Sequence, residues 1–206
     1  MTTLEYYGHS CFRLSNETGW SGVFDPYEAG SVPGIELPYV EADDVFISHG
    51  HADHNAKDAV KFPILIHDNP YQVTELLTDH DDAGGTLRGK NTITILSREG
   101  EKIAHFGDLG RDLTAEEREA LKGCDVMMIP CGGFFTIDAA QAKKIIQDLS
   151  PRLTVLMHYR TNESGYDVIA SEEEVLKVIP EARHTGKHRI RTSEEEGIIT
   201  MVPAKE

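Results

Sequence analysis

Cysteine is scarce in this sequence, and its placement excludes two common uses of paired thiols. The three cysteines, Cys11, Cys124 and Cys131, are an odd number and form no CxxC pair. A disulfide framework and a thiolate zinc site are therefore not indicated, and reduced, mostly buried thiols are expected. Cys131 precedes two glycines, but no base partner is evident for it, so it is not predicted to be a nucleophile.

Long apolar runs are missing as well. No stretch approaches the roughly 18 apolar residues that a membrane-spanning helix requires. The N-terminal residues Met1 to Tyr7 lack the basic stretch and the apolar core of a secretory signal peptide. We therefore expect a cytoplasmic protein without a membrane partner.

Positive charge is in short supply. The chain carries 20 basic and 35 acidic residues, which gives a formal net charge of −15. Because such a charge repels a polyanion, nucleic acid is not an expected partner and a small-molecule substrate is. The acidic runs at 172–174 and 194–196 are typical of solvated surface.

A glycine-rich phosphate-binding loop is also absent, since none follows the first predicted strand. This absence argues against the nucleotide-binding version of a doubly wound sheet. No linker, internal repeat or low-complexity tract marks a boundary within the 206 residues. A single domain over residues 1–206 is therefore predicted, and a homo-oligomer is compatible with it.

What the sequence does contain, in its first half, is a series of short β-rich runs bounded by Gly, Asn, Asp or Pro. Strands are predicted over residues 4–7, 11–14, 22–24, 45–48 and 64–67. Two further runs, 91–96 and 102–106, are predicted to form a hairpin.

The second half alternates helices and strands. Thr114, with Glu117 three residues later and Gly123 at the end, predicts a capped helix over 114–123. Further helices are predicted at about 138–149 and 173–178, and strands over 126–130, 153–157 and 197–202. This order predicts an α/β protein with two sheets packed face to face between helices, a four-layer αββα sandwich, and a single doubly wound sheet is the alternative.

Three histidines and an aspartate occupy six positions directly after the apolar run Val45-Phe46-Ile47. Crowding so many polar groups at the end of a buried strand is costly unless something binds them. Imidazole and carboxylate are ligands that zinc, iron and manganese accept. In strand-like geometry His49 and His51 point the same way and can meet one cation, whereas Asp53 and His54 follow a turn and can reach a second.

The run 49–54, His-Gly-His-Ala-Asp-His, matches the HxHxDH signature of the metallo-β-lactamase superfamily at all four defining residues. The chain resembles that superfamily over most of its length and is similar to its bacterial branch of ascorbate-6-phosphate lactonase-like proteins. The other segments that appear in family order are 8–12, 25–27, 80–81, 88–92, 105–110 and 158–159.

The resemblance implies a ligand set for two metal ions. One ion takes His49, His51 and a third histidine, the other takes Asp53, His54 and His158, and Asp108 bridges the two. Asp108 and His158 both follow apolar strands, where parallel sheets place their ligands. An N-cap role for Asp108 and a core position for His158 are the alternatives.

The third histidine has two candidates. His80 matches the His-Asp step of the family and precedes a loop. His105 lies three residues before Asp108 and would point to the opposite face of a regular strand. We therefore predict that His80 is the ligand.

Several other residues are predicted to support the site. His105, His9 and Asp25 are expected to orient ligands through hydrogen bonds, with plain packing as the alternative for His9 and Asp25. Arg88 and Asn91 offer a cation and an amide that could meet an anionic or carbonyl-bearing substrate, and the alternative is that they pin a loop.

The predicted function is that of a metal-dependent hydrolase in which a hydroxide held between two divalent ions attacks an ester, lactone or phosphodiester bond of a small molecule. Zn²⁺ is the expected metal, with Mn²⁺ or Fe²⁺ as alternatives. Asp53 and His158 are the predicted catalytic residues, and either Asp53 or a metal-bound water is expected to return the proton. A di-iron redox protein of the same fold and a non-catalytic metal-binding module are the alternative functions.

Overall fold

Alternation of apolar and polar residues in the first strands produces a sheet with one face in the core. The computed structural model describes residues 1–204. In the first strand, Leu4 and Tyr6 are buried and their neighbours are half-buried. The strands of this five-stranded sheet, in spatial order, are β13 (Arg189–Arg191), β1 (Thr3–Gly8), β2 (Cys11–Ser15), β3 (Ser21–Phe24) and β5 (Asp44–Phe46).

The second sheet has seven strands and two kinds of pairing. Strands β7, β8 and β9, at one side of the sheet, pair antiparallel with one another, and the pairings from β9 to β12 are parallel. The spatial order is β12 (Arg183–His184), β14 (Gly197–Thr200), β11 (Leu153–Met157), β10 (Val126–Pro130), β9 (Glu101–His105), β8 (Lys90–Arg98) and β7 (Gln72–Asp79). Both β10 and β11 are buried throughout, as parallel strands covered on two faces must be.

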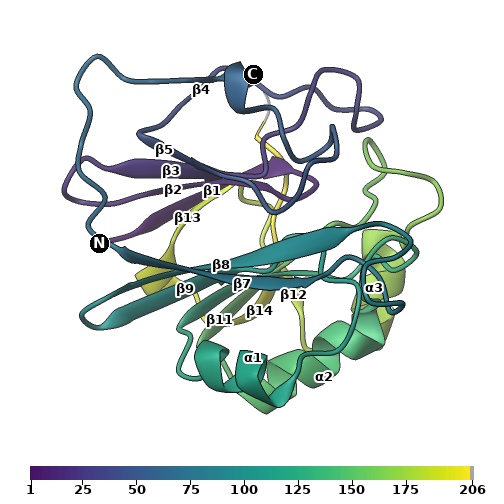
Figure 1. The fold of residues 1–206 in the computed structure, drawn as a ribbon. Coiled ribbons are helices and arrows are strands. Elements are labelled where there is room, and N and C mark those ends of the chain that lie inside the picture. The colour runs from purple at the N-terminus through teal and green to yellow at the C-terminus, as the bar shows by residue number, and fades with distance from the viewer. Residues whose placement is uncertain (205–206) are drawn as a thin grey trace.

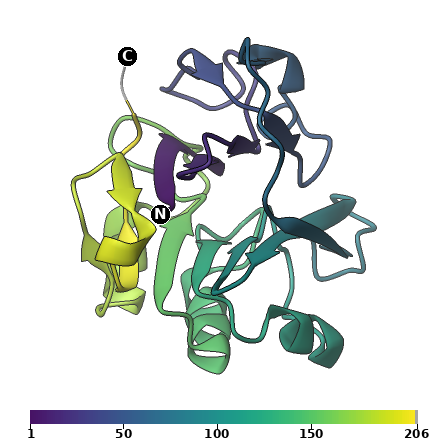
Figure 2. The ribbon, with the colours of Figure 1, turned by 90° about the vertical axis from the view of Figure 1, so that its left-hand side faces the viewer.

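Three α-helices cover the outer face of the seven-stranded sheet (Figure 1, Figure 2). They are α1 (Ala115–Leu121), α2 (Ala139–Leu149) and α3 (Glu172–Val178). Each begins with a capping box, and the box of Thr114 and Glu117 is the one that the sequence predicts. The three predicted helices are thus confirmed to within a few residues at their ends.

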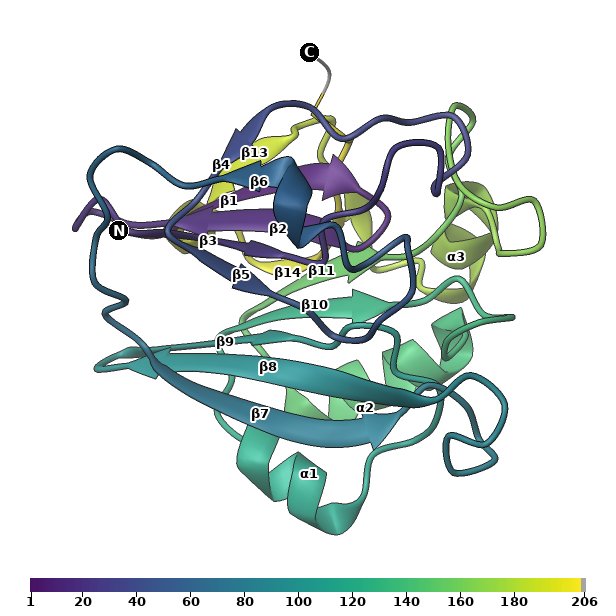
Figure 3. The ribbon, with the colours of Figure 1, turned by 45° about the horizontal axis from the view of Figure 1, so that its top comes forward.

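The predicted α/β class with two packed sheets is confirmed, and the difference from the expected αββα arrangement lies only in the outer layer over the five-stranded sheet. Among residues 1–204 it contains no α-helix, and consists of loops, the two-stranded sheet of β4 (Val40–Glu41) and β6 (Val60–Lys61), and the 3₁₀ helix η1 (Lys57–Ala59) (Figure 1, Figure 3). A second 3₁₀ helix, η2 (Thr192–Glu194), follows β13. Segment 26–70 contains five prolines, which limits the length of any helix there.

One predicted strand is wrong and one long strand was missed. Residues 64–67 form no strand, and Ile64, Leu65 and Ile66 are exposed. This segment carries the chain from the first layer to the second sheet, so no neighbouring strand is available to pair with it. The missed strand is β7, an edge strand whose side chains are mostly exposed, so it lacks the alternation that marks a half-buried strand.

The main core lies between the two sheets. Its largest fully buried side chains include Trp20, Phe12, Phe24 and Phe106. None of the helices formed by residues 1–204 has the length and apolar character needed to cross a membrane. The loops that follow β5, β7, β9 and β11 carry the histidines and aspartates described next.

Candidate metal centre

The polar residues predicted from the sequence meet where loops of the two sheets approach each other. His49, His51, Asp53 and His54 follow β5 of the five-stranded sheet. His80, Asp108 and His158 follow β7, β9 and β11 of the seven-stranded sheet.

A first group consists of His49, His51 and His80. His49 Nε2 lies 3.1 Å from His51 Nδ1, and the ring of His80 lies 4.6 Å from that of His49 and 5.2 Å from that of His51, measured between centroids. One nitrogen of each residue lies within 4.8 Å of the others. His80, and not His105, therefore completes this group.

A second group consists of Asp53, His54 and His158, together with His9. Asp53 Oδ2 lies 3.7 Å from His54 Nε2 and 3.2 Å from His9 Nε2. The ring centroids of His9 and His158 are 4.0 Å apart. His9, which the sequence predicts as a supporting residue, thus reaches the same carboxylate as the second group.

Asp108 lies between the two groups. Its Oδ2 is 3.1 Å from His158 Nε2, 3.3 Å from His54 Nε2 and 3.4 Å from His80 Nε2. Because a carboxylate has two oxygens, it can contact two cations at once where a single imidazole nitrogen cannot. This placement agrees with the bridging role implied by the resemblance.

Electrostatics favour neutral imidazoles at His49 and His80 and an ionised carboxylate at Asp108. Burial, reinforced by the nearby His54, lowers the pKa of His49 to about 3. Burial also lowers the pKa of His80. Burial raises the pKa of Asp108, but His158 and His54 outweigh that effect and bring it well below its usual range. A neutral imidazole offers the lone pair that a metal ion requires.

His54 behaves differently because two carboxylates face it. Burial lowers its pKa, but Asp108 and Asp25 outweigh burial and raise the pKa well above its usual value. The surroundings of His54 Nε2 therefore favour a positive charge at this atom, which either a proton or a metal ion can supply.

Asp25 fixes the orientation of His54. The buried carboxylate accepts hydrogen bonds from Ser48 N–H at 2.7 Å, from Ser48 Oγ–H at 2.6 Å and from His54 Nδ1 at 2.9 Å. With the proton of His54 on Nδ1, its Nε2 lone pair faces the centre of the site. The sequence did not identify Ser48, whose Oγ also lies 2.9 Å from His49 Nδ1.

Asn91 is not a substrate-binding residue, and its predicted role is corrected. Its side chain is fully buried, and its amide nitrogen donates to Thr78 Oγ1 and to the carbonyl of Phe106, both at 2.9 Å. Its amide oxygen accepts from the backbone N–H of Asp108 at 2.8 Å. All of its polar atoms are therefore used to hold the chain at Asp108, which is the loop-pinning alternative.

Gly107 allows this close approach. Its φ is +53°, and a Cβ built on it would lie 2.4 Å from both Asn91 Oδ1 and Ser48 Cβ. A side chain at this position would push apart the residues that hold Asp108 and Asp25.

His105 also supports the backbone segment that leads to Asp108. Its Nε2 lies 2.9 Å from the carbonyl oxygen of Ser10, and its Nδ1 accepts from Gly107 N–H at 3.2 Å. Its ring stacks on Phe24 with centroids 5.0 Å apart. Hydrogen bonds and packing both occur, and they act on the backbone before Asp108.

A cavity of about 260 Å³ opens beside Asp108. Its lining residues are His51, Asp53, His80, Arg88, Asp108, Phe135 and Tyr166. The sequence did not identify Tyr166, whose hydroxyl lies 2.6 Å from the Ser31 carbonyl oxygen and 3.2 Å from Asp53 Oδ2. The volume of the cavity is below the range of about 300–1,000 Å³ that is common for sites of drug-sized ligands, so the cavity suits a small molecule.

The donor atoms of the site fit divalent metal ions. Among residues 1–204, His54 Nε2 and Asp108 Oδ1 are buried and have no hydrogen-bond partner. Unpaired polar atoms in the interior are costly. Cations coordinated by nitrogen and oxygen would satisfy both, and such ligands suit zinc, manganese and iron.

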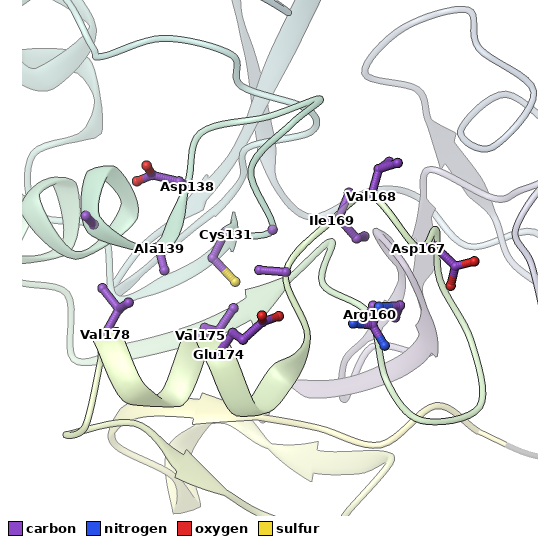
Figure 4. A pocket seen from close by; sticks show the side chains of 13 residues that line it. Cys131, Asp138, Ala139, Arg160, Asp167, Val168, Ile169, Glu174, Val175 and Val178 are labelled. Atoms are coloured by element: carbon purple, nitrogen blue, oxygen red, sulfur yellow. The ribbon is translucent and has the colours of Figure 1, made fainter.

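Cys131 lies outside this site. A separate cavity of about 420 Å³, lined also by Arg160, Asp167 and Glu174, contains its side chain (Figure 4). The thiol is fully buried, its Sγ donates to the Met157 carbonyl at 3.4 Å, and burial raises its pKa strongly. The expectation of an inert, buried cysteine fits this environment.

Comparison with known proteins places the chain in a family. A model of the beta-lactamase superfamily domain matches residues 3–158. A UPF0173 metal-dependent hydrolase of Thermoplasma acidophilum is 26% identical over 205 residues, covering 84% of this chain and 88% of the relative.

Solved structures agree with this assignment. A protein of Thermotoga maritima, described as a candidate Zn-dependent hydrolase of the metallo-β-lactamase superfamily, has a TM-score of 0.75 and 27% identity, with 98% of each chain covered. A metallo hydrolase of Ignicoccus hospitalis has a TM-score of 0.62 and 21% identity, covering 87% of this chain and 91% of the other. The family model, the strand order and the clustered HxHxDH residues together show that this chain belongs to the metallo-β-lactamase superfamily.

Proposed function

We propose that the protein is a metal-dependent hydrolase that cleaves an ester or lactone bond, or a phosphodiester bond, of a small molecule. The observation that carries the proposal is the convergence of two ligand groups on one carboxylate, Asp108, beside a small cavity. The relatives from T. acidophilum and T. maritima are named as hydrolases that use a metal or zinc, which supports the same chemistry here.

The two groups are proposed to hold one ion each. His49, His51 and His80 would hold the first ion, and Asp53, His54 and His158 the second, with Asp108 contacting both. Zn²⁺ is the proposed metal because imidazole nitrogen dominates both groups, and Mn²⁺ and Fe²⁺ are the alternatives.

When bound, divalent ions would supply Lewis-acid polarisation of the scissile bond and a lowered pKa for water. The chain itself orients the reactants. Asp25 accepts from His54 Nδ1 and so turns Nε2 towards the centre of the site, and Asn91 holds the backbone of Asp108.

Asp53 is the proposed proton carrier. It is half-buried at the cavity wall, and its Oδ2 receives the contacts of His9 and Tyr166. A carboxylate held in this way can accept a proton from the attacking water and return it to the leaving oxygen. His158, whose ligand nitrogen lies within 4.8 Å of an Asp53 oxygen, is proposed to act with it by fixing the second ion.

The test combines metal analysis with hydrolysis. Protein purified without added metal is analysed for its elements, and turnover of a lactone, an aryl ester and bis(4-nitrophenyl) phosphate is measured before and after chelation. About two zinc or manganese ions per chain with chelator-sensitive turnover is the expected result. Two iron ions without hydrolysis would favour the redox alternative, and metal without turnover the binding module.

Matched variants sharpen the test. Asp108→Ala and His51→Ala should abolish turnover in folded protein supplied with metal, whereas His188→Ala, which removes an exposed histidine, should leave turnover unchanged. Hydrolysis that survives in Asp108→Ala and His51→Ala would refute the proposed mechanism.

A further inference from the structure

Arg88 is the cationic side chain of the cavity beside Asp108. Among residues 1–204, no lysine and no other arginine lines this cavity. Within residues 1–204, the guanidinium of Arg88 makes no ion pair or hydrogen bond with the protein, whereas seven other arginines are paired with carboxylates. Within the same residues, Arg152 and Arg160 also lack an ion pair with a carboxylate, but Arg88 is the arginine that lines the cavity beside Asp108.

The position of Arg88 is fixed by its backbone. The buried carboxylate of Asp81 accepts from the backbone N–H groups of Arg88 at 2.7 Å, Leu87 at 3.0 Å, Gly85 at 2.8 Å and Ala83 at 2.9 Å. Burial raises the pKa of Asp81, but these four donors outweigh burial and lower it to about 2. The loop is therefore a closed turn that begins directly after His80.

Aromatic rings orient the guanidinium without using its N–H donors. Arg88 Cζ lies 6.0 Å from the ring centroid of Phe134 and 5.8 Å from that of Phe135. Contacts of this kind attract a cation while leaving its hydrogen-bonding edge free. The rings belong to the loop after β10, which extends from the same end of the sheet as the loop between β7 and β8 (Figure 3).

The backbone of the aromatic loop is strained. Phe134 has a φ of +58° and is 61% exposed. A bulky non-glycine residue in this region of φ is uncommon, and such strain gathers at sites of function. Phe135 continues into the cavity wall, where its ring lies 5.5 Å from that of Tyr166.

We propose that Arg88 selects the substrate by binding a carboxylate or phosphate group placed away from the scissile bond, while Phe135 and Tyr166 contact the intervening apolar part. The proposal rests on the proposed hydrolase function and names its substrate class, a small anionic ester. The guanidinium presents donors in the fork geometry that matches both kinds of oxyanion. Because the net charge of −15 repels anions, a cationic side chain at the cavity favours binding of such a substrate.

Turnover tests the proposal with three aryl esters that share one leaving group. These are 4-nitrophenyl acetate, the mono-4-nitrophenyl ester of succinic acid, and the 4-nitrophenyl ester of phosphonoacetic acid. Arg88→Ala should reduce kcat/KM for a charged ester by about 10- to 100-fold, mostly through KM, the loss expected when a charged hydrogen bond of about 1.5–3 kcal/mol is removed. The acetate ester should change by less than about threefold, and the larger effect among the two charged esters identifies carboxylate or phosphate.

Direct binding provides a second readout that needs no turnover. Isothermal titration calorimetry of the metal-loaded protein compares N-(4-nitrophenyl)succinamic acid with neutral 4-nitroacetanilide. The acid should bind more tightly to the wild type, and Arg88→Ala should remove that preference. Arg191→Ala, which removes the same charge from an exposed arginine, should retain it.

The outcomes separate the two proposals. If no ester is hydrolysed in a metal-dependent manner, the hydrolase proposal fails, while an Arg88-dependent preference for the acid in calorimetry still supports the anion site. If the acid binds no better than the neutral anilide, or if Arg88→Ala and Arg191→Ala behave alike, the anion site is refuted whatever the turnover.

Discussion

Replacing Asp25 by asparagine should weaken metal binding at His54 without removing any ligand. The two oxygens of Asp25 have different partners: Oδ1 accepts from Ser48 N–H, and Oδ2 accepts from Ser48 Oγ–H and His54 Nδ1. Because the backbone N–H of Ser48 must meet an acceptor, the asparagine oxygen takes the place of Oδ1. The amide nitrogen then faces His54.

This exchange moves the imidazole proton of His54 from one ring nitrogen to the other. An amide N–H donates to His54 Nδ1, so the imidazole proton moves to Nε2, the atom that lies 3.3 Å from Asp108 Oδ2. A protonated Nε2 has no lone pair for a metal ion. Loss of a partner that orients a ligand typically lowers metal affinity by about 10- to 100-fold, which corresponds to about 1.4–2.8 kcal/mol.

The chain offers a matched control in Asp43. This buried carboxylate also accepts from a serine, at Ser21 N–H, and from a histidine, at His67 N–H, but it lies away from the candidate ligands. Asp43→Asn and Asp25→Asn should each lower the free energy of unfolding of the metal-free protein by about 1.5–3 kcal/mol. Only Asp25→Asn should weaken metal binding.

Competition with a chromophoric zinc chelator measures the affinity, and urea unfolding of the metal-free proteins measures stability. Asp25→Asn protein that binds zinc as tightly as the wild type, while losing the same stability as Asp43→Asn, would show that Asp25 only supports the fold.

Three further predictions concern the third histidine, the close approach at Gly107 and the loop before Arg88. Elemental analysis should find less bound metal in His80→Ala than in the wild type, and His105→Ala should retain more metal than His80→Ala; equal loss would contradict the choice of His80. Gly107→Ala should lower the free energy of unfolding in urea by about 1–3 kcal/mol, because a Cβ at φ +53° meets Ser48, and unchanged stability would be evidence against that contact. Asp81 has a pKa of about 2 in the folded protein and about 3.9 when unfolded, so its contribution to stability is present above pH 4 and disappears as the pH falls towards 2. The difference in free energy of unfolding between wild type and Asp81→Asn should therefore decrease over that pH range. A difference independent of pH would contradict this prediction.

The elements whose structure depends on residues close together in the sequence were the most predictable. The capping box at Thr114 is local, and the buried strands β10 and β11 are continuous apolar runs, so their elements could be predicted. The edge strand β7 and the exposed run at 64–66 could not, because their structure depends on which neighbours the fold supplies.

The same distinction applies to the site. The ligand candidates could be named from the HxHxDH pattern and its resemblance to a superfamily. Ser48 and Tyr166 carry no pattern, since each acts through a contact made across the fold. Asn91 was predicted to bind substrate, but its amide is fully used within the protein. The sequence alone does not show whether the hydrogen bonds of such an amide are already made.

The division of the centre between two sheets has a consequence during synthesis. A nascent chain that has emerged only through β9 and Asp108 already contains the HxHxDH loop and His80, but His158 and β13, which pairs with β1, are still to be made. Such a chain can offer a cation only part of the ligand set. Metal loading at the full centre is therefore linked to completion of the polypeptide, so the order of translation delays the reactive site until the fold that encloses it is available.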